Sequence, residues 1–509
     1  LFPSRLDENI SSDAPVRLVN RIVDELDISP LLSTYKGGGC PAYYPRMLLK
    51  VLFFAYLNNV YSCRKIARLL QENILYMWLS GKSTPDFRTI NDFRSKRLKS
   101  CIHSLFTQIV LMLVDLGYIS LEKQYIDGTK MESAANRYTF VWRKSVEKYK
   151  ERLKKKIQCI LSQIDEGILC DNHAPEESTL SIDSRALKEK IDAINLENRS
   201  KRELRQIKKL NEEYLPKLQE YEKHLETMDE RNSYSKTDLE ATFMRMKEDH
   251  MLNGQLKPAY NVQIAVENYY IVHGYVSSDR TDYNTLIPVL EKHKTAFGSI
   301  LEEVTADSGY CSEKNLLYLK RNEISSYIKL QDHEKRKTRA YSEDISKYYN
   351  MRTGIFEDEQ FYICHDGREL RHLRTESKEQ DGYTQTFEVY GCADCSGCEH
   401  KARCLYKYDA EKDAEKNKVM KINEQWEELK ERSHANIQSE RGILKRQTHS
   451  IQTEGHFGDI KENENFRRFN YRSADKVYKE FMLYAIGRNI NKYHRFLYEK
   501  LRKFEGKTA

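Results

Sequence analysis

The stretch "PAYNVQIAVENYYIVHGYVS" (258–277) decides the fold class, because apolar and polar residues alternate along it with a period of two. This period is typical of β-strands that have one face buried, and Asn268 marks a turn between two runs of it. We therefore predict two adjacent strands, over 258–266 and 269–277, joined near Asn268.

Strands and helices alternate on either side of this predicted hairpin. A short strand, "QYID" (124–127), precedes it, and a helix, "YNTLIPVLEKHKTAF" (283–297), follows it. Next come the strand "ILEEVTAD" (300–307), a helix from about Ser312 and the strand "SSYIKLQ" (325–331). Three early strands followed by helix–strand crossovers predict an α/β fold, with an RNase H-like mixed sheet flanked by helices.

Three helical regions and one cysteine-rich region lie outside this core. The N-terminal region is predicted to be all-α, a charged helical arm interrupts the core, and the C-terminal helices complete the core. The predicted boundaries are 1–118 for the N-terminal domain, 119–142 and 238–334 for the core, 143–237 for the arm, 335–410 for the cysteine-rich insertion and 411–509 for the C-terminal part.

The arm is predicted to be a helical hairpin with a coiled-coil seam. "RKSVEKYKERLKKKIQCILSQI" (143–164) is one amphipathic helix, and the polar link 171–179 suits the tip of the hairpin. Pro216 lies off the seam and should kink the second helix. The seam residues are spaced by three and four, as in a heptad repeat. They are Leu204, Ile207, Asn211, Tyr214, Leu218, Tyr221, Leu225 and Met228.

Composition narrows the functional classes. The chain has 509 residues, of which 39% are apolar and 32% charged, and its formal net charge is +7. That excess of positive charge is compatible with nucleic-acid binding but too small to prove it. The longest apolar stretch, 47–57, is too short to span a bilayer and contains Lys50. No signal peptide is visible, so we expect a soluble, cytoplasmic protein with no membrane partner.

Basic residues gather on the predicted N-terminal helices. A helix over 43–59 and a second over 62–73, with Ser62 as its N-cap, resemble a helix-turn-helix. A third helix follows "STPDFRT" (83–89). The alternative is a plain helical bundle with solvated basic faces. The candidate DNA-binding residues of this region are Arg64, Lys65, Arg68, Arg94, Lys96 and Arg97.

Two aspartates occupy the same position relative to a strand. Asp127 and Asp307 each follow a short apolar run, and Gly128 directly after Asp127 predicts a turn at that point. If the two strands are neighbours, the carboxylates lie close together and require a cation to offset their repulsion. Oxygen ligands favour Mg²⁺ or Mn²⁺ over zinc.

A third acid is expected from the helix predicted within "SIQTEGHFGDIKENENFRRF" (450–469). Glu454 and Lys461, seven residues apart, lie roughly on one face of such a helix. Lys461 would then meet a phosphate next to the metal-bound carboxylates, and Arg467 and Arg468 would extend the basic surface.

Four cysteines in "CADCSGCEHKARC" (392–404) have the close spacing of metal ligands. We predict a structural zinc ion bound by thiolates, with Cys364 or His400 as a possible replacement for one ligand. An iron–sulfur cluster and free thiols in a reducing compartment are the alternatives. The predicted ligands are Cys392, Cys395, Cys398 and Cys404.

Several long motifs resemble those of a known family. "PRMLLKVLFFAYLNNVYSCRKIARLLQENI" (45–74) with "PDFRTINDFR" (85–94) resembles the InsH-type N-terminal domain of bacterial insertion-sequence transposases. "YIDGTKMESAANRYTFVWRKS" (125–145) and "VTADSGY" (304–310), together with 450–469, are similar to the catalytic-domain motifs of that group. The resemblance covers nearly the whole chain and implies a DDE transposase with an RNase H-like catalytic domain.

The resemblance implies both a reaction and its partners. The acidic triad falls on Asp127, Asp307 and Glu454 and would bind two Mg²⁺ or Mn²⁺ ions, with Lys461 beside them. These ions would activate water to cut DNA at the transposon ends, and the freed 3′-hydroxyl would then be joined to target DNA. The partners would be double-stranded DNA and a second copy of the chain. The alternatives are an inactive or domesticated zinc-containing DNA-binding protein and another RNase H-like nuclease.

Overall fold

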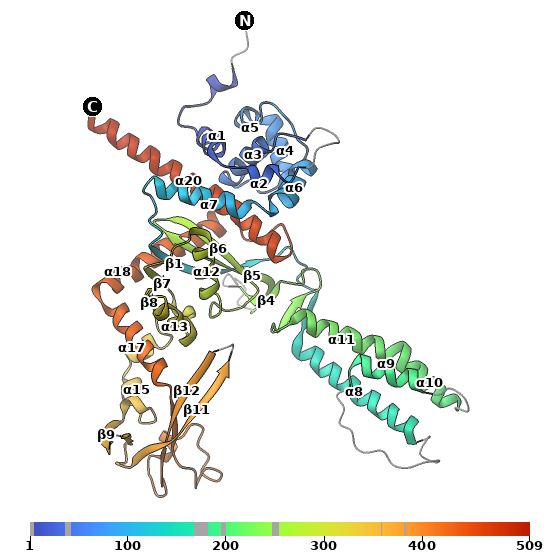
Figure 1. Cartoon of the computed structure of the whole chain (residues 1–509), viewed down its shortest axis with the longest axis vertical. Helices are drawn as coiled ribbons and strands as arrows, with labels where there is room; N and C mark the ends of the chain where they lie inside the picture. The colour runs from blue at the N-terminus through green and yellow to red at the C-terminus, as the bar shows by residue number, and fades with distance from the viewer. Residues whose placement is uncertain are drawn as a thin grey trace.

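The computed structural model places the N-terminal helices over a central sheet, with a helical arm extending to one side and a second sheet below (Figure 1). The predicted tip of the arm, 171–179, lies outside the residues that the structure describes. The described residues are 5–35, 42–166, 182–194, 200–246, 254–357, 359–380 and 383–508.

The central sheet has six strands and is mixed, as predicted. Its order is β4-β5-β1-β7-β8, and β6 pairs with the same edge of β5 as β4 does. β1 runs antiparallel to β5 and parallel to β7, and β7 runs parallel to β8. This arrangement is consistent with an RNase H-like core. The bounds are Lys123–Glu132 for β1, Thr242–Arg245 for β4, Leu256–Glu267 for β5, Tyr270–Ser277 for β6, Glu303–Ala306 for β7 and Ser325–Ile328 for β8.

The predicted hairpin is confirmed by β5 and β6. Its turn consists of Asn268 and Tyr269, whose φ angles are 47° and 69°. Positive φ at both central residues is the signature of a type I′ turn, whose twist matches that of the flanking strands. The position of this turn sets the register of β5 against β6.

The predicted turn after Asp127 is wrong. β1 continues for five residues past Asp127, and Gly128 pairs with Gln263 in the antiparallel ladder. The long partner β5 extends the strand. What ends near Asp127 is the parallel pairing with β7, whose last pair is Ile126 with Ala306. Asp127 and Asp307 therefore both lie one residue beyond that last pair.

The two faces of the sheet pack against different helices. On one face, α12 (Leu286–Phe297), α13 (Glu313–Arg321) and α17 (Glu424–Gln438) form a core with alternate residues of the sheet, among them Ile126 and Ala265. The opposite face packs against α20 (Ala474–Thr508) in a core that it shares with the N-terminal helices.

The N-terminal helices are joined to the sheet through α20 (Figure 1). Gly487 of α20 is so close to α3 that an added Cβ would lie 2.7 Å from the backbone nitrogen of Leu57. Among the described residues, no single helix is long and apolar enough to cross a membrane, although 87–99 and 102–115, bent by 79°, meet that test as a pair. The main N-terminal helices are α1 Pro15–Glu25, α3 Pro45–Leu57, α4 Cys63–Glu72, α5 Ile74–Leu79, α6 Phe87–Lys96 and α7 Ile102–Asp115.

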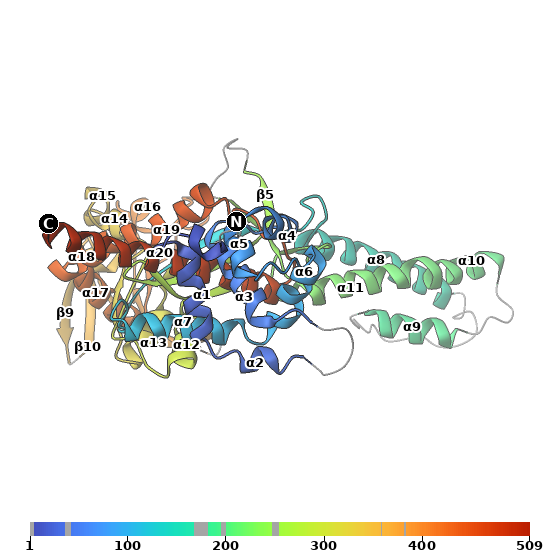
Figure 2. The same ribbon diagram turned by 90° about the horizontal axis from the view of Figure 1, so that it is seen from above.

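The arm has its own small core and extends away from the body (Figure 2). Its second helix differs from the predicted heptad seam, because a π-helical turn, Leu210–Tyr214, interrupts it just before Pro216. Leu204, which precedes this turn, and Asn211, which lies within it, are exposed, and Leu210 is buried. The arm helices are α8 Arg143–Glu166, α9 Ser184–Ala193, α10 Lys201–Lys209 and α11 Leu215–Met228.

The cysteine-rich region forms a second, antiparallel sheet in the order β13-β12-β11-β10-β9. Its longest strands, β11 and β12, make a hairpin whose turn end is directed toward the body (Figure 1), where Tyr383 and Gln385 donate hydrogen bonds to Glu313 of α13. β13 lies within 411–509, which was predicted to be helical, so that prediction is wrong at this strand. The bounds are Arg352–Phe356 for β9, Glu359–Ile363 for β10, Glu369–Gln380 for β11, Tyr383–Cys392 for β12 and Val419–Ile422 for β13.

Candidate active site

Asp127 and Asp307 lie together at the point where the parallel ladder of β1 and β7 ends. Asp127 is buried, and its Oδ1 accepts a hydrogen bond from the backbone nitrogen of Gly128 at 2.7 Å. Asp307 caps a 3₁₀ turn, Ser308–Tyr310, and its Oδ1 accepts from the nitrogen of Gly309 at 2.8 Å. Both aspartates line one pocket of about 500 Å³. The pairing of these two acids, inferred from the sequence, is therefore reproduced in space.

The same pocket holds a third carboxylate that the sequence reasoning missed. Asp282 lies in the loop between β6 and α12 and lines the pocket together with the cations Lys130 and Arg280. Burial, followed by the charges of Asp282, Asp127 and Asp307, raises the pKa of the Tyr310 hydroxyl well above its usual value. The three carboxylates thus act on one buried phenol.

Glu454 does not line this pocket. It is exposed on a π-helical turn, Ser450–Glu454, where its Oε2 accepts a hydrogen bond from Ser450 Oγ at 2.8 Å. The preceding helix α18 (Glu440–His449) nevertheless lies against β1, because His449 Nε2 donates to the carbonyl oxygen of Ile126 at 3.0 Å. The helix carrying Glu454 therefore packs beside Asp127, while its carboxylate stays outside the pocket.

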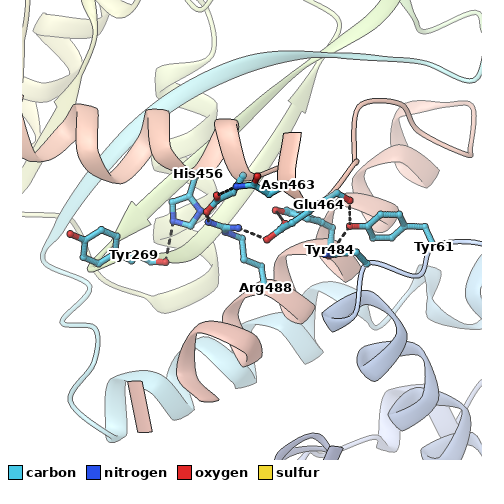
Figure 3. A network of polar contacts seen from close by, with 9 residues as sticks. Tyr61, Tyr269, His456, Asn463, Glu464, Tyr484 and Arg488 are labelled. Carbon is cyan, nitrogen blue, oxygen red and sulfur yellow. Dashed lines mark hydrogen bonds and ion pairs between the residues drawn. The ribbon is translucent and has the colours of Figure 1, made fainter. Parts of the chain in front are cut away.

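A buried polar network fixes the segment that follows Glu454 (Figure 3). Arg488 of α20 donates to Nδ1 of His456 at 2.7 Å, to Oε1 of Glu464 at 2.6 Å and to Oδ2 of Asp459 at 2.8 Å. Tyr61 of the N-terminal region donates to the carbonyl oxygen of Glu464 at 3.0 Å. The network therefore connects the N-terminal helices, the Glu454 segment and α20.

His456 has a defined protonation state within this network. Its Nε2 lies 3.0 Å from the carbonyl oxygen of Tyr269, and its Nδ1 accepts from Arg488. Burial, followed by the positive charges of Arg488 and Lys492, lowers its pKa well below the usual value. The imidazole is therefore neutral near pH 7 and carries its hydrogen on Nε2.

The other predicted residues of the Glu454 segment have structural contacts. Lys461 is buried, and its carbonyl oxygen accepts from Arg467 Nε at 2.9 Å. Arg467 also pairs with Glu462. Arg468 donates to the carbonyl oxygens of Ser133 and Ala135, at 3.1 and 3.2 Å. Both arginines remain about half exposed.

The candidate DNA-binding residues of the N-terminal region fall into two groups. Arg64, Lys65 and Arg68 are exposed on α4, and Lys96 is exposed beside Asp92. Arg97 donates to the carbonyl oxygen of Thr34 and stacks on Tyr35, its guanidinium carbon 4.4 Å from the ring centre.

Arg94 is not available for DNA contact. It is 4% exposed, and its guanidinium donates to the hydroxyls of Tyr471 and Tyr56 and to the carbonyl oxygen of Tyr61. These hydrogen bonds give Arg94 a structural role between α3, α6 and the segment before α20, which corrects its assignment from sequence.

The cysteine cluster is not arranged as a metal site. Cys392 is buried and its Sγ donates to the carbonyl oxygen of Asp394 at 3.1 Å, while Cys395 Sγ accepts from the nitrogen of Lys418 at 3.3 Å. Burial raises the pKa of Cys392 to about 11. Nowhere in the described ranges are three or more His, Cys, Asp or Glu side chains grouped to hold a metal ion. The structure therefore does not support the predicted zinc ion on Cys392, Cys395, Cys398 and Cys404, or with Cys364 or His400 as a substitute.

Two transposase families match separate parts of the chain. Residues 4–96, which include the helices up to α6, match the family described as Transposase domain (DUF772). Residues 363–494, which include Glu454 but neither Asp127 nor Asp307, match the family described as Transposase DDE domain. No curated protein matches the chain. The chain therefore carries two transposase domains, and its resemblance to the DDE transposases of bacterial insertion sequences is confirmed.

Proposed function

We propose that this DNA transposase binds the ends of its own insertion sequence, cleaves phosphodiester bonds there and joins the resulting 3′-hydroxyl ends to target DNA. The observation that carries the proposal is the placement of Asp127 and Asp307, each one residue past the last parallel pair of adjacent strands and both lining one pocket. A carboxylate pair of this kind is the usual oxygen-ligand set for Mg²⁺ or Mn²⁺.

The pocket offers the carboxylate oxygens that a divalent cation prefers, although its acids are not grouped at coordinating distance in the described structure. Asp127 and Asp307 would hold it, and bound there it would lower the pKa of the attacking oxygen and offset charge on the leaving oxygen. The residues around them suit a phosphodiester, because Lys130 and Arg280 line the same pocket and carry the positive charge that a DNA phosphate needs. In detail, we propose that two such ions are bound and that water is the attacking group in the cleavage step.

Glu454 is the proposed third acid of the triad. Its support is its position on a helix that packs beside β1 and its place within the range matched by the DDE domain family. Because its carboxylate lies outside the pocket, its participation requires a change in the π-helical turn that carries it. π-helical turns are often found at functional sites.

The proposed DNA surface combines exposed basic residues from both ends of the chain. Arg64, Lys65 and Arg68 present their charges on α4, and Arg467 and Arg468 are half exposed near the end of β1. Phosphate contacts of this type fix the position of a protein on DNA without reading its sequence. Since two transposon ends have to be joined, we propose that a homodimer assembles on the DNA.

The test is cleavage of linear DNA that carries the ends of the element, in the presence of Mg²⁺ or Mn²⁺. We expect Asp127→Asn and Asp307→Asn to abolish cleavage while binding to the ends persists. Asp279→Asn is the matched control, because it removes the same charge from the loop after β6 and Asp279 does not line the pocket. Cleavage by Asp127→Asn at the wild-type rate would refute the assignment.

One observation favours a second candidate, a DNA-binding protein that has lost cleavage, namely the position of Glu454 outside the pocket. Wild-type protein that binds the ends but leaves them uncut with either cation would support that candidate. Cleavage without joining to a second duplex would instead indicate another RNase H-like nuclease.

A further inference from the structure

We propose that Asp282 supplies a third carboxylate to the cation pocket, beside Asp127 and Asp307, and so contributes directly to divalent-cation binding. This inference rests on the proposed function, because it concerns the same pocket. It assigns a role to a residue that lies in a loop and belongs to none of the motifs that identify the two strand-end aspartates.

Two buried amides hold the carboxylate of Asp282 in place. Asn261 Nδ2 and Gln263 Nε2 each donate to Oδ1 of Asp282 at 2.8 Å. Both amides belong to β5 and are at most 2% exposed. The hydroxyl of Tyr310, which is fully buried, donates to Oε1 of Gln263. This bond turns the NH₂ group of Gln263 toward Asp282.

Burying these amides costs hydration free energy. In a strand that is otherwise apolar, that cost is recovered only when every donor and acceptor finds a partner. Here the partners form a chain from Tyr310 through Gln263 to Asp282, and Gln263 also donates to Asn261 at 3.0 Å. The chain ends at a carboxylate on the pocket wall, so its effect is to fix the position of that carboxylate.

Two glycines make room for Asp282. A Cβ at Gly128 would lie 2.2 Å from Nε2 of Gln263 and 2.6 Å from Oδ1 of Asp282, which is too close for any side chain there. A Cβ at Gly309 would lie 3.0 Å from Oδ1 of Asp307 and 3.4 Å from Oδ2 of Asp282. The glycine next to Asp127 and the glycine two residues after Asp307 therefore let a third acid approach both.

The charge arrangement points to a cation. Both amide hydrogen bonds fall on Oδ1 of Asp282, whereas its Oδ2 and Oδ1 of Asp307 lie within 3.4 Å of the same point beside Gly309. Like charges this close repel each other in a partly buried site. Among the described residues these acids are not grouped at coordinating distance, so binding requires Asp127 and Asp307 to move toward the carboxylate that the two amides hold.

The test is calorimetric titration of the full chain with Mn²⁺, with no DNA present. We expect Asp282→Asn to bind Mn²⁺ about tenfold or more weakly than wild type, as loss of a ligand or of its support commonly does. Asp279→Asn, which makes the same charge change in the same loop, should bind like wild type. Wild-type affinity in Asp282→Asn, with weakened binding in Asp127→Asn, would overturn the role of Asp282 and leave the proposed function intact.

A second measurement separates ligation from a structural role. Without Mn²⁺, Asp282→Asn should unfold at the wild-type temperature or higher, because the asparagine oxygen still accepts from both amides and like-charge repulsion is removed. Only the stabilisation by added Mn²⁺ should shrink. A lower unfolding temperature without Mn²⁺, together with an unchanged gain on adding it, would refute the proposal. If Asp127→Asn and Asp307→Asn also bind Mn²⁺ like wild type, the proposed cation pocket itself fails, and the role of Asp282 fails with it.

Gly309→Ala tests the same idea with all three acids retained. Its added Cβ would lie 3.0 Å from Oδ1 of Asp307, so that oxygen must shift slightly, and it would fill the space between Asp307 and Asp282. We expect weaker Mn²⁺ binding than in wild type. Unchanged affinity in this variant would contradict the role of the glycine in bringing the two acids together.

Discussion

Replacement of Arg488 by methionine tests whether the buried network holds the Glu454 segment in place. Methionine keeps much of the side-chain volume but removes three charge-assisted hydrogen bonds, to His456, Glu464 and Asp459. The Arg488 side chain is 9% exposed and that of Glu464 is 15% exposed, so the variant leaves a carboxylate buried without its cation.

The magnitude follows from this burial. Removing one partner of a buried ion pair costs roughly 3–5 kcal/mol. Asp459 is 41% exposed, and solvent screens its ion pair with Arg488, so losing this pair adds little to the cost. The lower end of that range therefore applies. We expect a local loss of about 3 kcal/mol, which corresponds to opening of the segment roughly 100-fold more often.

Hydrogen exchange read by mass spectrometry measures this directly, on peptides that cover 455–469. Lys96→Met is the control, because it breaks an exposed pair with Asp92 and should cost at most about 1 kcal/mol. Adding Glu464→Gln to Arg488→Met should recover part of the loss, since the stranded charge is then gone. Exchange in Arg488→Met that rises less than about fivefold would refute the reasoning.

Three further predictions follow from packing and protonation. Gly487→Ala should destabilise the docking of α20 on α3 by about 1–3 kcal/mol, seen as a lower unfolding temperature, because the new Cβ meets the backbone at Leu57; an unchanged temperature would show that the helices separate freely. In the folded protein His456 is neutral, whereas in the unfolded chain it binds a proton below about pH 6.5. The free energy of unfolding therefore decreases as the pH falls below that value, by about 1.4 kcal/mol per pH unit. Urea unfolding at pH 7 and pH 5.5 should therefore differ less in His456→Gln than in wild type, and an equal difference would contradict this. Arg94→Met should lower the unfolding temperature, because Arg94 is buried and hydrogen-bonded. Arg68→Ala should leave that temperature unchanged but weaken DNA binding and reduce its salt dependence, because Arg68 is exposed. The reverse pattern would restore Arg94 as a DNA contact.

The sequence predicts elements whose signals are local. The β5–β6 hairpin is encoded by its alternation and by its turn at Asn268, and both are properties of neighbouring residues. The shared strand-end position of Asp127 and Asp307 is also visible in the sequence, but that their strands are parallel neighbours comes from the structure.

Long-range contacts decide the features that the sequence analysis missed. Gly128 looks like a turn residue, but the length of β5 keeps β1 extended there. Asp282 sits in a loop with no strand-end pattern. The available signal for it was Asn261 and Gln263, two amides on the same side of an apolar strand, which indicate a polar pocket beneath them.

Burial of single charged residues is likewise set by tertiary packing. Arg94 has the same local surroundings as its exposed neighbour Lys96, and only the arrival of Tyr471 from the far end of the chain encloses it. The heptad pattern of the arm fails at Asn211, where a π-helical turn begins one residue earlier and Leu210 is the buried residue instead.

The shared core of α20 and the N-terminal helices determines when this protein can fold. Tyr61 and Glu464, which are hydrogen-bonded in the network beside α20, are 403 residues apart in the chain. During synthesis the apolar faces of α3 and α7 emerge long before α20, the helix that covers them. Closing so long a loop is slow, and the exposed faces are prone to aggregation until then. The core that α20 shares with α3 and α7 can therefore form only after α20 has been translated.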